Sequence, residues 1–322
     1  MPESLLKKLD RKNFFPRFIF GIKANLFYSF EYQINFLKEG KGRGFDTYKF
    51  LKIINELKKD KLIKHKDIIT PEPLNDSDIL LVHTEEYLNW IKRPLNLQEV
   101  LNTDYLTEFD EDAFNVFRYI SGGTYQGALT ALKNKKPSFN FSGGFHHALK
   151  NRGEGFCPIN DVAIAIKKLK KEYKAENVLI IDLDYHQGNG NKSIFKFDET
   201  VFTFSVHAVQ WDYDEAVSSL DIKVKSDISG EEYLKVLKEN LNFITDKFRP
   251  DLIFYLAGSD PYESDSLCDM NLTEEIMLKR DLEVLNYSKQ LNVPIIILPA
   301  GGYGDKSWKI YYNFIKYCLL FG

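Results

Sequence analysis

The segment that decides the fold is Val178-Leu-Ile-Ile-Asp-Leu-Asp-Tyr-His-Gln-Gly-Asn-Gly190. Its apolar first half predicts a buried strand of a parallel sheet, and the glycines that close it predict a turn. Asp182, Asp184 and His186 are two residues apart, so in an extended chain their side chains lie on one face. Carboxylates and an imidazole suit zinc, and a third protein ligand would leave one position for water. A strand end with solvated polar residues is the simpler interpretation, so other segments must decide between the two.

Composition narrows the class of protein. The chain has 322 residues, of which 44% are hydrophobic and 28% charged, as in ordinary globular proteins. A formal net charge of −3 gives no reason to expect binding to nucleic acid or to an anionic membrane. Cys157, Cys268 and Cys318 lack C-x-x-C spacing, which argues against a disulfide framework and indicates a reducing, cytoplasmic location. We expect no signal peptide, because the N-terminal Met1-Pro-Glu-Ser-Leu-Leu-Lys-Lys lacks its apolar core, and no membrane span, because no apolar run approaches ~20 residues.

Segments with strand character alternate with segments of helical periodicity along the chain. This alternation predicts an α/β fold, a mostly parallel sheet with helices on both faces. We expect a single domain over residues 1–322, with residues 1–70 as an elaboration of it. The pair Gly122-Gly123 predicts a close helix contact or a kink. Strands are expected at 139–142, 178–183, 201–206, 251–256 and 293–298, helices at 50–57, 85–91, 113–132, 162–173, 234–244 and 280–291, and a loop at 94–112.

Five of these strands end in a polar or glycine-rich turn. In open parallel sheets, ligands bind beyond the carboxyl ends of the strands. Each turn alone is compatible with a structural role, but five at one edge, with most of the chain's six histidines, favour a functional site. The turns carry His146 and His147, Asp182 with Asp184 and His186, Ser205 with His207, Asp260, and Gly301-Gly-Tyr303.

Several segments together resemble the zinc-dependent histone deacetylase family. The likeness extends from about His83 to Tyr303, and it is closest to the class IV branch of the family. It implies the arginase-deacetylase fold, a parallel sheet of about eight strands between helices. The segments that carry it are Gly143-Gly-Phe-His-His-Ala148, Gly155-Phe-Cys-Pro-Ile-Asn-Asp161, Ile181-Asp-Leu-Asp-Tyr-His-Gln-Gly-Asn-Gly190, Ala257-Gly-Ser-Asp260 and Ala300-Gly-Gly-Tyr303, with Val82-His-Thr-Glu-Glu-Tyr-Leu88 and Lys279-Arg-Asp281 favouring class IV.

The resemblance assigns a role to each matching position. Asp184, His186 and Asp260 match the ligands of Zn²⁺, with Fe²⁺ as a second option. His146 and His147 match the tandem histidines, with His147 as the proton shuttle. Asp182 is the partner of His146, and Asn189 stands where other branches place an aspartate behind His147. Tyr303 matches the oxyanion donor, and Gly155 and Phe156 match the wall of the acyl-lysine channel. Structural K⁺ is implied at Asp182, Asp184, His186, Ser205 and Val206, and a second such site at Phe195, Asp198 and Val201.

These roles also make chemical sense. A bound metal polarises an amide carbonyl and lowers the pKa of water toward ~7. A histidine within hydrogen-bond reach accepts the proton and later protonates the leaving amine. A tyrosine on a glycine hinge can donate to the developing oxyanion. Since an asparagine carries no charge to stabilise an imidazolium, we expect His147 to be less basic than it would be beside an aspartate.

Three functions remain open. The first is a zinc amidohydrolase that removes acyl groups, acetyl or long-chain fatty acyl, from lysine side chains of proteins. The second is a deacylase of small molecules such as acetylpolyamines, and the third is a metal-binding scaffold without turnover. The rim motif of class IV is incomplete, because its nearest match, Arg43-Gly-Phe-Asp46, lacks the histidine and proline. Apolar candidates for an acyl pocket, which are equally suited to the core, are Phe14, Phe15, Phe18, Phe20 and Phe27.

Overall fold

The structure is a computed structural model that describes residues 4–10, 23–33, 48–103, 106, 110 and 112–321. Its strands form one eight-stranded sheet in the order β2-β1-β3-β8-β7-β4-β5-β6, and every neighbouring pair is parallel. This confirms the expected α/β fold. The strands are β1 (Asn25–Phe27), β2 (Ile68–Ile69), β3 (Ser138–Asn140), β4 (Val178–Asp182), β5 (Val201–His207), β6 (Ser219–Lys223), β7 (Leu252–Leu256) and β8 (Ile295–Leu298).

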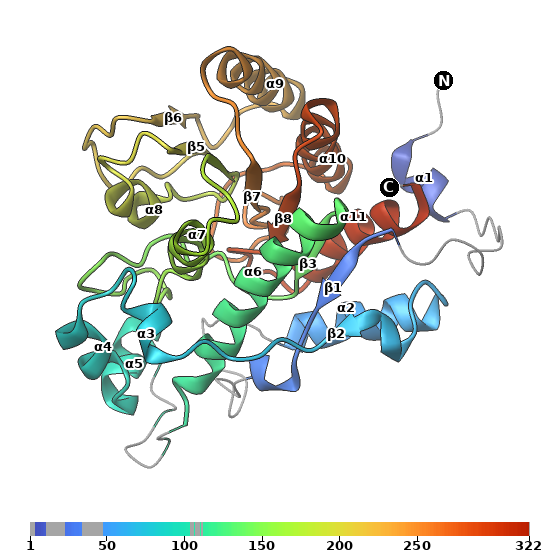
Figure 1. Cartoon of the computed structure of the whole chain (residues 1–322). Coiled ribbons are helices and arrows are strands. Elements are labelled where there is room, and N and C mark those ends of the chain that lie inside the picture. The colour runs from blue at the N-terminus through green and yellow to red at the C-terminus, as the bar shows by residue number, and fades with distance from the viewer. Residues whose placement is uncertain are drawn as a thin grey trace.

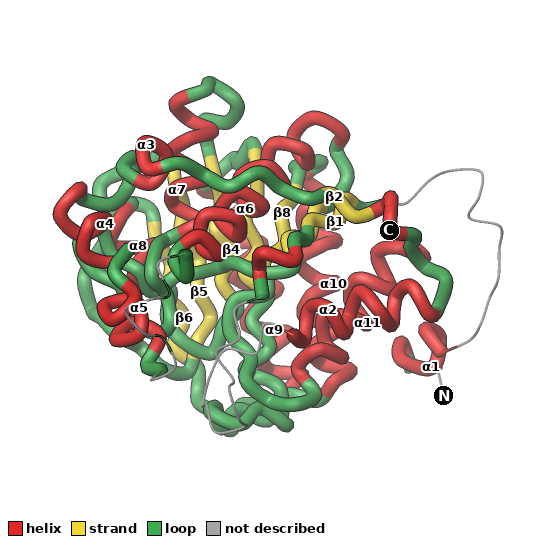
Figure 2. The backbone as a smooth tube through the Cα atoms, turned by 90° about the horizontal axis from the view of Figure 1, so that it is seen from below, coloured by secondary structure: helices red, strands yellow, loops and turns green. Residues whose placement is uncertain are grey.

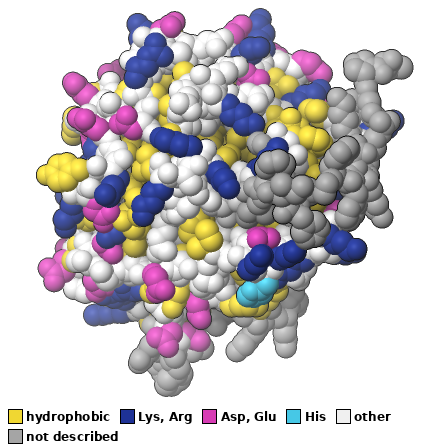
Figure 3. Space-filling model, turned by 45° about the vertical axis from the view of Figure 1, so that its right-hand side comes forward, with side chains coloured by type: hydrophobic (Ala, Val, Ile, Leu, Met, Phe, Trp, Pro, Cys, Tyr) yellow, Lys and Arg dark blue, Asp and Glu magenta, His cyan; other side chains and the backbone are white. Residues whose placement is uncertain are grey.

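Eleven α-helices and two short 3₁₀ turns surround the sheet within the described residues (Figures 1 and 2). None of these helices combines the length and the apolar character needed to cross a bilayer. Positive and negative side chains are interspersed over the face shown in Figure 3. The helices are α1 (Leu5–Asp10), α2 (Tyr48–Lys59), α3 (Asp76–Ile79), α4 (Glu85–Ile91), α5 (Pro94–Leu101), α6 (Asn115–Asn134), α7 (Asp161–Lys171), α8 (Asn189–Ile194), α9 (Gly230–Lys247), α10 (Glu274–Leu291) and α11 (Ser307–Phe321), and the 3₁₀ turns are Phe30–Tyr32 and His65–Asp67.

The alternation of side chains along the strands explains the two helical layers. Ile296 of β8 points to the α6 side, where its Cδ1 lies against Gly127. The next residue, Ile297, is paired with Phe139 and Tyr255 and shares their opposite face. On that face the rings of Phe139 and Tyr255 pack against Phe314 of α11. The sheet is therefore covered on both sides, and its central strands are fully buried.

Helix α6 crosses the sheet without interruption at its glycine pair. A Cβ at Gly122 would lie 1.9 Å from the carbonyl oxygen of Glu72, and one at Gly123 would lie 2.0 Å from the hydroxyl of Tyr32. The pair therefore marks a close contact of the helix with its neighbours.

One expectation about local structure is wrong, and the condition attached to another is not met. Residues 94–112 are not simply a loop, because α5 occupies Pro94–Leu101 and buries Leu97 and Leu101. The extended conformation after Val178 ends at Asp182, where β4 ends, so Asp184 and His186 lie in the following turn rather than on one strand face. The candidate rim Arg43–Asp46 and the phenylalanines at 14, 15, 18 and 20 lie outside the described residues, and Phe27 is buried in β1.

Candidate active site

The carboxyl ends of β3, β4, β7 and β8 meet at one place in the structure. Parallel strands all end at the same edge of a sheet, so the turns that follow them converge. The turn after β4 brings Asp184 and His186, the turn after β7 brings Asp260, and Gly301 follows β8. The main-chain N–H of Gly301 donates to Asp184 Oδ2 at 2.7 Å, which joins the β4 and β8 turns directly.

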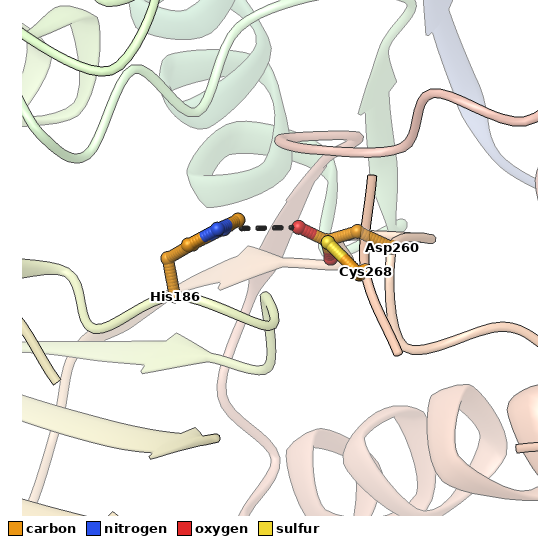
Figure 4. Close-up of side chains that lie close together, drawn as sticks. All are labelled: His186, Asp260 and Cys268. Carbon is orange, nitrogen blue, oxygen red and sulfur yellow. Dashed lines mark ion pairs between the residues drawn. The ribbon is translucent and has the colours of Figure 1, made fainter. Parts of the chain in front are cut away.

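Two carboxylates and an imidazole form a compact cluster at this edge. His186 Nδ1 lies 3.2 Å from Asp184 Oδ1. It lies 3.4 Å from Asp260 Oδ2, the ion pair that is dashed in Figure 4. Asp260 is fully buried, and its Oδ1 accepts from the main-chain N–H of Tyr185 at 3.0 Å. Its Oδ2 is buried without a hydrogen-bond partner. A buried carboxylate oxygen without a donor is costly unless a cation occupies the adjacent space, so these residues fit a divalent metal.

The pKa shifts of Asp260 and His186 also fit a site for a divalent metal. Burial and the nearby charge of Asp184 raise the pKa of Asp260 to about 7. Burial lowers the pKa of His186, but the carboxylates of Asp184 and Asp260 outweigh it and raise that pKa to about 10. The pocket therefore holds excess negative charge that a proton partly neutralises, and a bound metal would neutralise it instead.

Glycines let the backbone approach these carboxylates. A Cβ at Gly301 would lie 2.4 Å from Asp184 Oδ2 and 2.5 Å from Asp260 Oδ2. A Cβ at Gly258 would lie 2.6 Å from Asp184 Oδ2. Any side chain at either position would occupy the space between the two acids.

The tandem histidines of the β3 turn lie beside this cluster in two different environments. His146 Nδ1 donates to Asp182 Oδ2 at 2.7 Å. Burial lowers the pKa of His146, but Asp182 and Asp184 together raise it to about 9. For His147, burial and the positive charge of His146 hold the pKa well below its ordinary value. Near neutral pH the pair therefore consists of a charged His146 and a neutral His147.

Asn189 fixes the orientation of the neutral histidine. His147 Nδ1 donates to Asn189 Oδ1 at 2.6 Å, so the other ring nitrogen, Nε2, is free to accept a proton. Asn189 Nδ2 in turn donates to Glu154 Oε1 at 2.6 Å, which sets the amide with its oxygen toward His147. Glu154 thus orients Asn189 behind His147, and it did not emerge from the sequence pattern.

A charge-restoring variant should reveal which histidine titrates during turnover. In Asn189→Asp/Glu154→Gln the hydrogen bond between the two side chains is kept, while a carboxylate replaces the amide beside His147. An opposite charge at this distance raises a pKa by about one to three units. Because a base works only when unprotonated, we expect the acid limb of the kcat/KM profile to move to higher pH by that amount. Glu154→Gln alone is the control, and an unmoved acid limb in the double variant would contradict the assignment of His147.

Tyr303 lies in the turn that follows β8, and the protein holds this turn on both sides. Its N–H donates to Asp265 Oδ2 at 2.7 Å, and the buried Lys49 ammonium donates to the carbonyl of Gly302 at 2.7 Å. Gly302 has φ +135° and approaches Ser259 too closely for a side chain. Burial and the charge of Asp184 raise the pKa of Tyr303, so its hydroxyl stays a proton donor.

Aromatic rings surround the approach to the histidines. Phe156 has its ring centroid 5.9 Å from that of Tyr303, and both Gly155 and Phe156 have positive φ angles. Trp211 stacks on His147 with centroids 3.9 Å apart and an interplanar angle of 11°. A Cβ at Gly155 would lie 2.3 Å from His147 and 3.0 Å from Trp211. The sequence pattern did not identify Trp211, because nothing near position 211 shows which ring it meets.

The first expected K⁺ position lies where β4 and β5 run side by side. Asp182 is paired with Ser205 in the sheet, and Ser205 Oγ lies 2.8 Å from His207 Nδ1. At the second position, the Asp198 carboxylate lies 3.1 Å from the ammonium of Lys167. That lysine already supplies a positive charge there.

Two further residues, His83 and Cys157, make structural contacts. His83 is buried and accepts from the main-chain N–H of Asn160 through Nε2 at 2.9 Å, and burial lowers its pKa to about 4. Cys157 is buried, and its thiol donates to the carbonyl of Gly155 at 3.3 Å. Neither residue belongs to the reacting centre.

Arg280 holds the turns that carry the metal-ligand candidates, a role the sequence alone did not reveal. It is fully buried in α10 and paired with Asp281 at 2.7 Å. Its guanidinium donates to the carbonyls of Leu183 and Gly258 at 3.1 and 2.7 Å. A charged residue on the buried face of a helix is the one signal that could have indicated it.

Fold and site together define the class: an α/β protein with a candidate metal centre and paired histidines beyond the carboxyl edge of a parallel sheet. Residues 44–314 match the histone deacetylase domain family. The chain is 31% identical to histone deacetylase 2 of Arabidopsis thaliana over 298 residues, which cover 89% of this chain and 76% of that protein. This chain therefore belongs to the histone deacetylase family, a family of deacetylase hydrolases.

Two other proteins are similar to this chain over part of their own length. The chain is 29% identical to histone deacetylase B of Dictyostelium discoideum and spans 61% of that protein. The crystal structure of a histone deacetylase homologue from Aquifex aeolicus superimposes with a TM-score of 0.74 at 24% identity, covering 92% of this chain and 84% of the other. That likeness supports the fold and confirms the expected arginase-deacetylase architecture.

Proposed function

We propose that this protein is a zinc-dependent amidohydrolase that removes acyl groups from the ε-amine of lysine in proteins. The observation that carries the proposal is the placement of His146 and His147 beside a carboxylate–imidazole cluster in which Asp260 Oδ2 is buried and accepts no hydrogen bond. When bound, the metal would supply a Lewis acid that polarises the acyl carbonyl and makes water a better nucleophile. Asp184, His186 and Asp260 would hold Zn²⁺, or Fe²⁺ in its place.

The remaining residues handle protons and charge. His147, with Nε2 free and a low pKa, accepts the proton of the attacking water and returns it to the leaving amine. His146 stays charged through Asp182 and stabilises the negative charge that develops on the acyl oxygen. Tyr303 donates its hydroxyl proton in a hydrogen bond to the same oxygen. Phe156 and Gly155 on one side and Trp211 on the other form the walls along which the lysine stem reaches the centre.

Tyr303→Phe tests the oxyanion role. A donor that acts mainly in the transition state affects kcat rather than substrate binding, so we expect kcat to fall by about 10²–10³ with KM nearly unchanged. Steady-state kinetics on an acyl-lysine peptide measure both constants. Tyr317→Phe, on α11, is the matched control and should behave like the wild type. A raised KM at unchanged kcat would make Tyr303 a binding residue only.

The substrate class separates the proposal from its alternatives. A protein lysine deacylase should turn over acyl-lysine peptides, whereas a small-molecule deacylase should prefer acetylpolyamines. A metal-binding scaffold should turn over neither. An activity profile over acetyl-, octanoyl- and myristoyl-lysine peptides and acetylpolyamines therefore distinguishes the three.

We further propose that residues 1–322 form one catalytic domain. Structural K⁺ would bind near Asp182 and Ser205. The protein would act in a reducing intracellular compartment.

Acyl-chain length is the finer prediction. On the class IV resemblance, we expect long-chain acyl-lysine to be hydrolysed at least as well as acetyl-lysine. Each buried methylene of an acyl chain can contribute ~0.8 kcal/mol, so a myristoyl chain in an apolar pocket would offset a poorer fit at the carbonyl. Comparing kcat/KM for acetyl- and myristoyl-lysine on one peptide measures the preference. A clear preference for acetyl would mean a closed pocket and a short-acyl enzyme.

A further inference from the structure

A thiol lies next to the candidate metal centre. The ligand atoms of His186, Asp260 and Cys268 all lie within 4.8 Å of one another. Figure 4 shows the Cys268 sulfur beside the Asp260 carboxylate, on the side that faces His186. Two of these three side chains are expected metal ligands, whereas Cys268 has no assigned role.

The second observation concerns the carboxylate of Asp260. Asp260 is fully buried, and its Oδ2, the oxygen nearest to His186, has no hydrogen-bond partner. Because a carboxylate oxygen of Asp260 lies within 4.8 Å of the sulfur, a cation bound to this carboxylate would be within reach of Cys268. Atoms that bind one tetrahedral zinc lie roughly 3.5 Å apart, so a shift of about 1 Å would bring the sulfur into ligand position.

The loop that carries Cys268 is positioned by the same acid that holds Tyr303. Asp265 Oδ1 accepts from the main-chain N–H groups of Leu267 and Cys268 at 2.9 and 3.3 Å. Its other oxygen accepts from the N–H of Tyr303 at 2.7 Å. Cys268 is only partly buried. The thiol and the oxyanion donor therefore lie on linked loops.

We propose that Cys268 is a fourth, exchangeable protein ligand of the metal held by Asp184, His186 and Asp260. This inference rests on the proposed function of that site. On binding, the sulfur forms a bond to the cation and the thiol proton passes to solvent, so no oxidant or reductant is needed. A thiolate in the fourth position would close a centre that three ligands leave open. The Cys268-bound form is therefore a resting state, and turnover requires release of the sulfur.

Cobalt(II) substitution tests this directly, because thiolate-bound cobalt shows a sulfur-to-metal charge-transfer band in the near ultraviolet. The full-length protein is loaded with Co²⁺, and its spectrum is compared with those of Cys268→Ser and Cys157→Ser. We expect the band in the wild type and in Cys157→Ser, whose thiol is buried against Gly155. We expect its complete loss in Cys268→Ser at unchanged cobalt stoichiometry.

The outcomes separate the two proposals. Stoichiometric cobalt without the band in the wild type would overturn the role of Cys268 and leave the metal centre intact. A band that persists in Cys268→Ser would do the same. Failure of the wild type to bind cobalt at all would overturn both the metal centre and the thiol ligand. As a second readout, Cys268→Ala should retain full cobalt binding with d–d bands that differ from those of the wild type.

Discussion

Metal binding should disappear when Asp260 is replaced by asparagine, and turnover should disappear with it. Asp260 supplies a fully buried carboxylate, and its Oδ2 accepts no hydrogen bond although it lies 3.4 Å from His186 Nδ1. An amide keeps the shape of the side chain but removes the charge that attracts the cation. Metal analysis after dialysis should give zinc near one equivalent for the wild type and for the control Asp305→Ala, an exposed position, and far less for Asp260→Asn.

Stability provides a readout of the same variant that does not depend on activity. Burial and Asp184 raise the pKa of Asp260 from its ordinary value of 3.8 to about 7. In the metal-free protein this group therefore contributes stability at low pH that is lost as the pH rises through about 7. From about pH 5 to about pH 8, the Tm of the metal-free wild type should fall more than that of Asp260→Asn.

Added zinc should stabilise the wild type but not Asp260→Asn. A ligand that binds only the folded state raises its stability, so zinc should raise the Tm of the wild type and leave that of Asp260→Asn unchanged. Full stoichiometric zinc in Asp260→Asn and in Asp260→Ala would overturn the ligand assignment, whatever the activity of the variants.

Much of the fold follows from patterns that are local in the sequence. The five expected strands are present. Strands β4, β7 and β8 are buried on both faces and are almost entirely apolar, whereas β3 and β5 were recognised from aromatic and β-branched residues that alternate with polar ones. Helix α4 begins and ends at the expected residues, Glu85 and Ile91, since Thr84 caps it and its apolar face is regular. Helix α5 was not predictable in this way, because only Leu97 and Leu101 mark its buried face. Strand β6 is an edge strand whose residues are only partly buried, so its apolar pattern is weak.

Some residues of the candidate site could also be predicted from the sequence, and others could not. The residues that end strands could be grouped from the sequence, because all carboxyl ends of a parallel sheet share one edge. Trp211, Glu154 and Cys268 reach the site from turns and loops whose course depends on tertiary packing. The split between a charged His146 and a neutral His147 depends on burial and on distances of a few ångströms. Such quantities have no counterpart in residue spacing.

His147→Ala should lower kcat by about 10²–10⁴, the usual contribution of a positioned acid–base group. We propose His147 as the shuttle because its low pKa leaves Nε2 unprotonated near neutral pH, whereas the charged His146 cannot accept a proton. Its ring contacts Trp211 and Asn189, and it is not among the expected metal ligands. We therefore expect zinc stoichiometry to stay at the wild-type level, as in the control His65→Ala, an exposed position.

Chemical rescue sharpens the test of the shuttle. In the wild type the ring centroids of His147 and Trp211 are 3.9 Å apart. The alanine variant therefore leaves a space against the face of Trp211. Free imidazole that enters this space can accept a proton there, so added imidazole should restore part of kcat in His147→Ala and none in Tyr303→Phe. His147→Gln, which fills the space, should be as slow as the alanine variant and should not respond to imidazole. If His147→Ala kept wild-type kcat while His146→Ala lost it, the roles of the two histidines would be reversed, and the low pKa of His147 would then reflect burial without catalytic use.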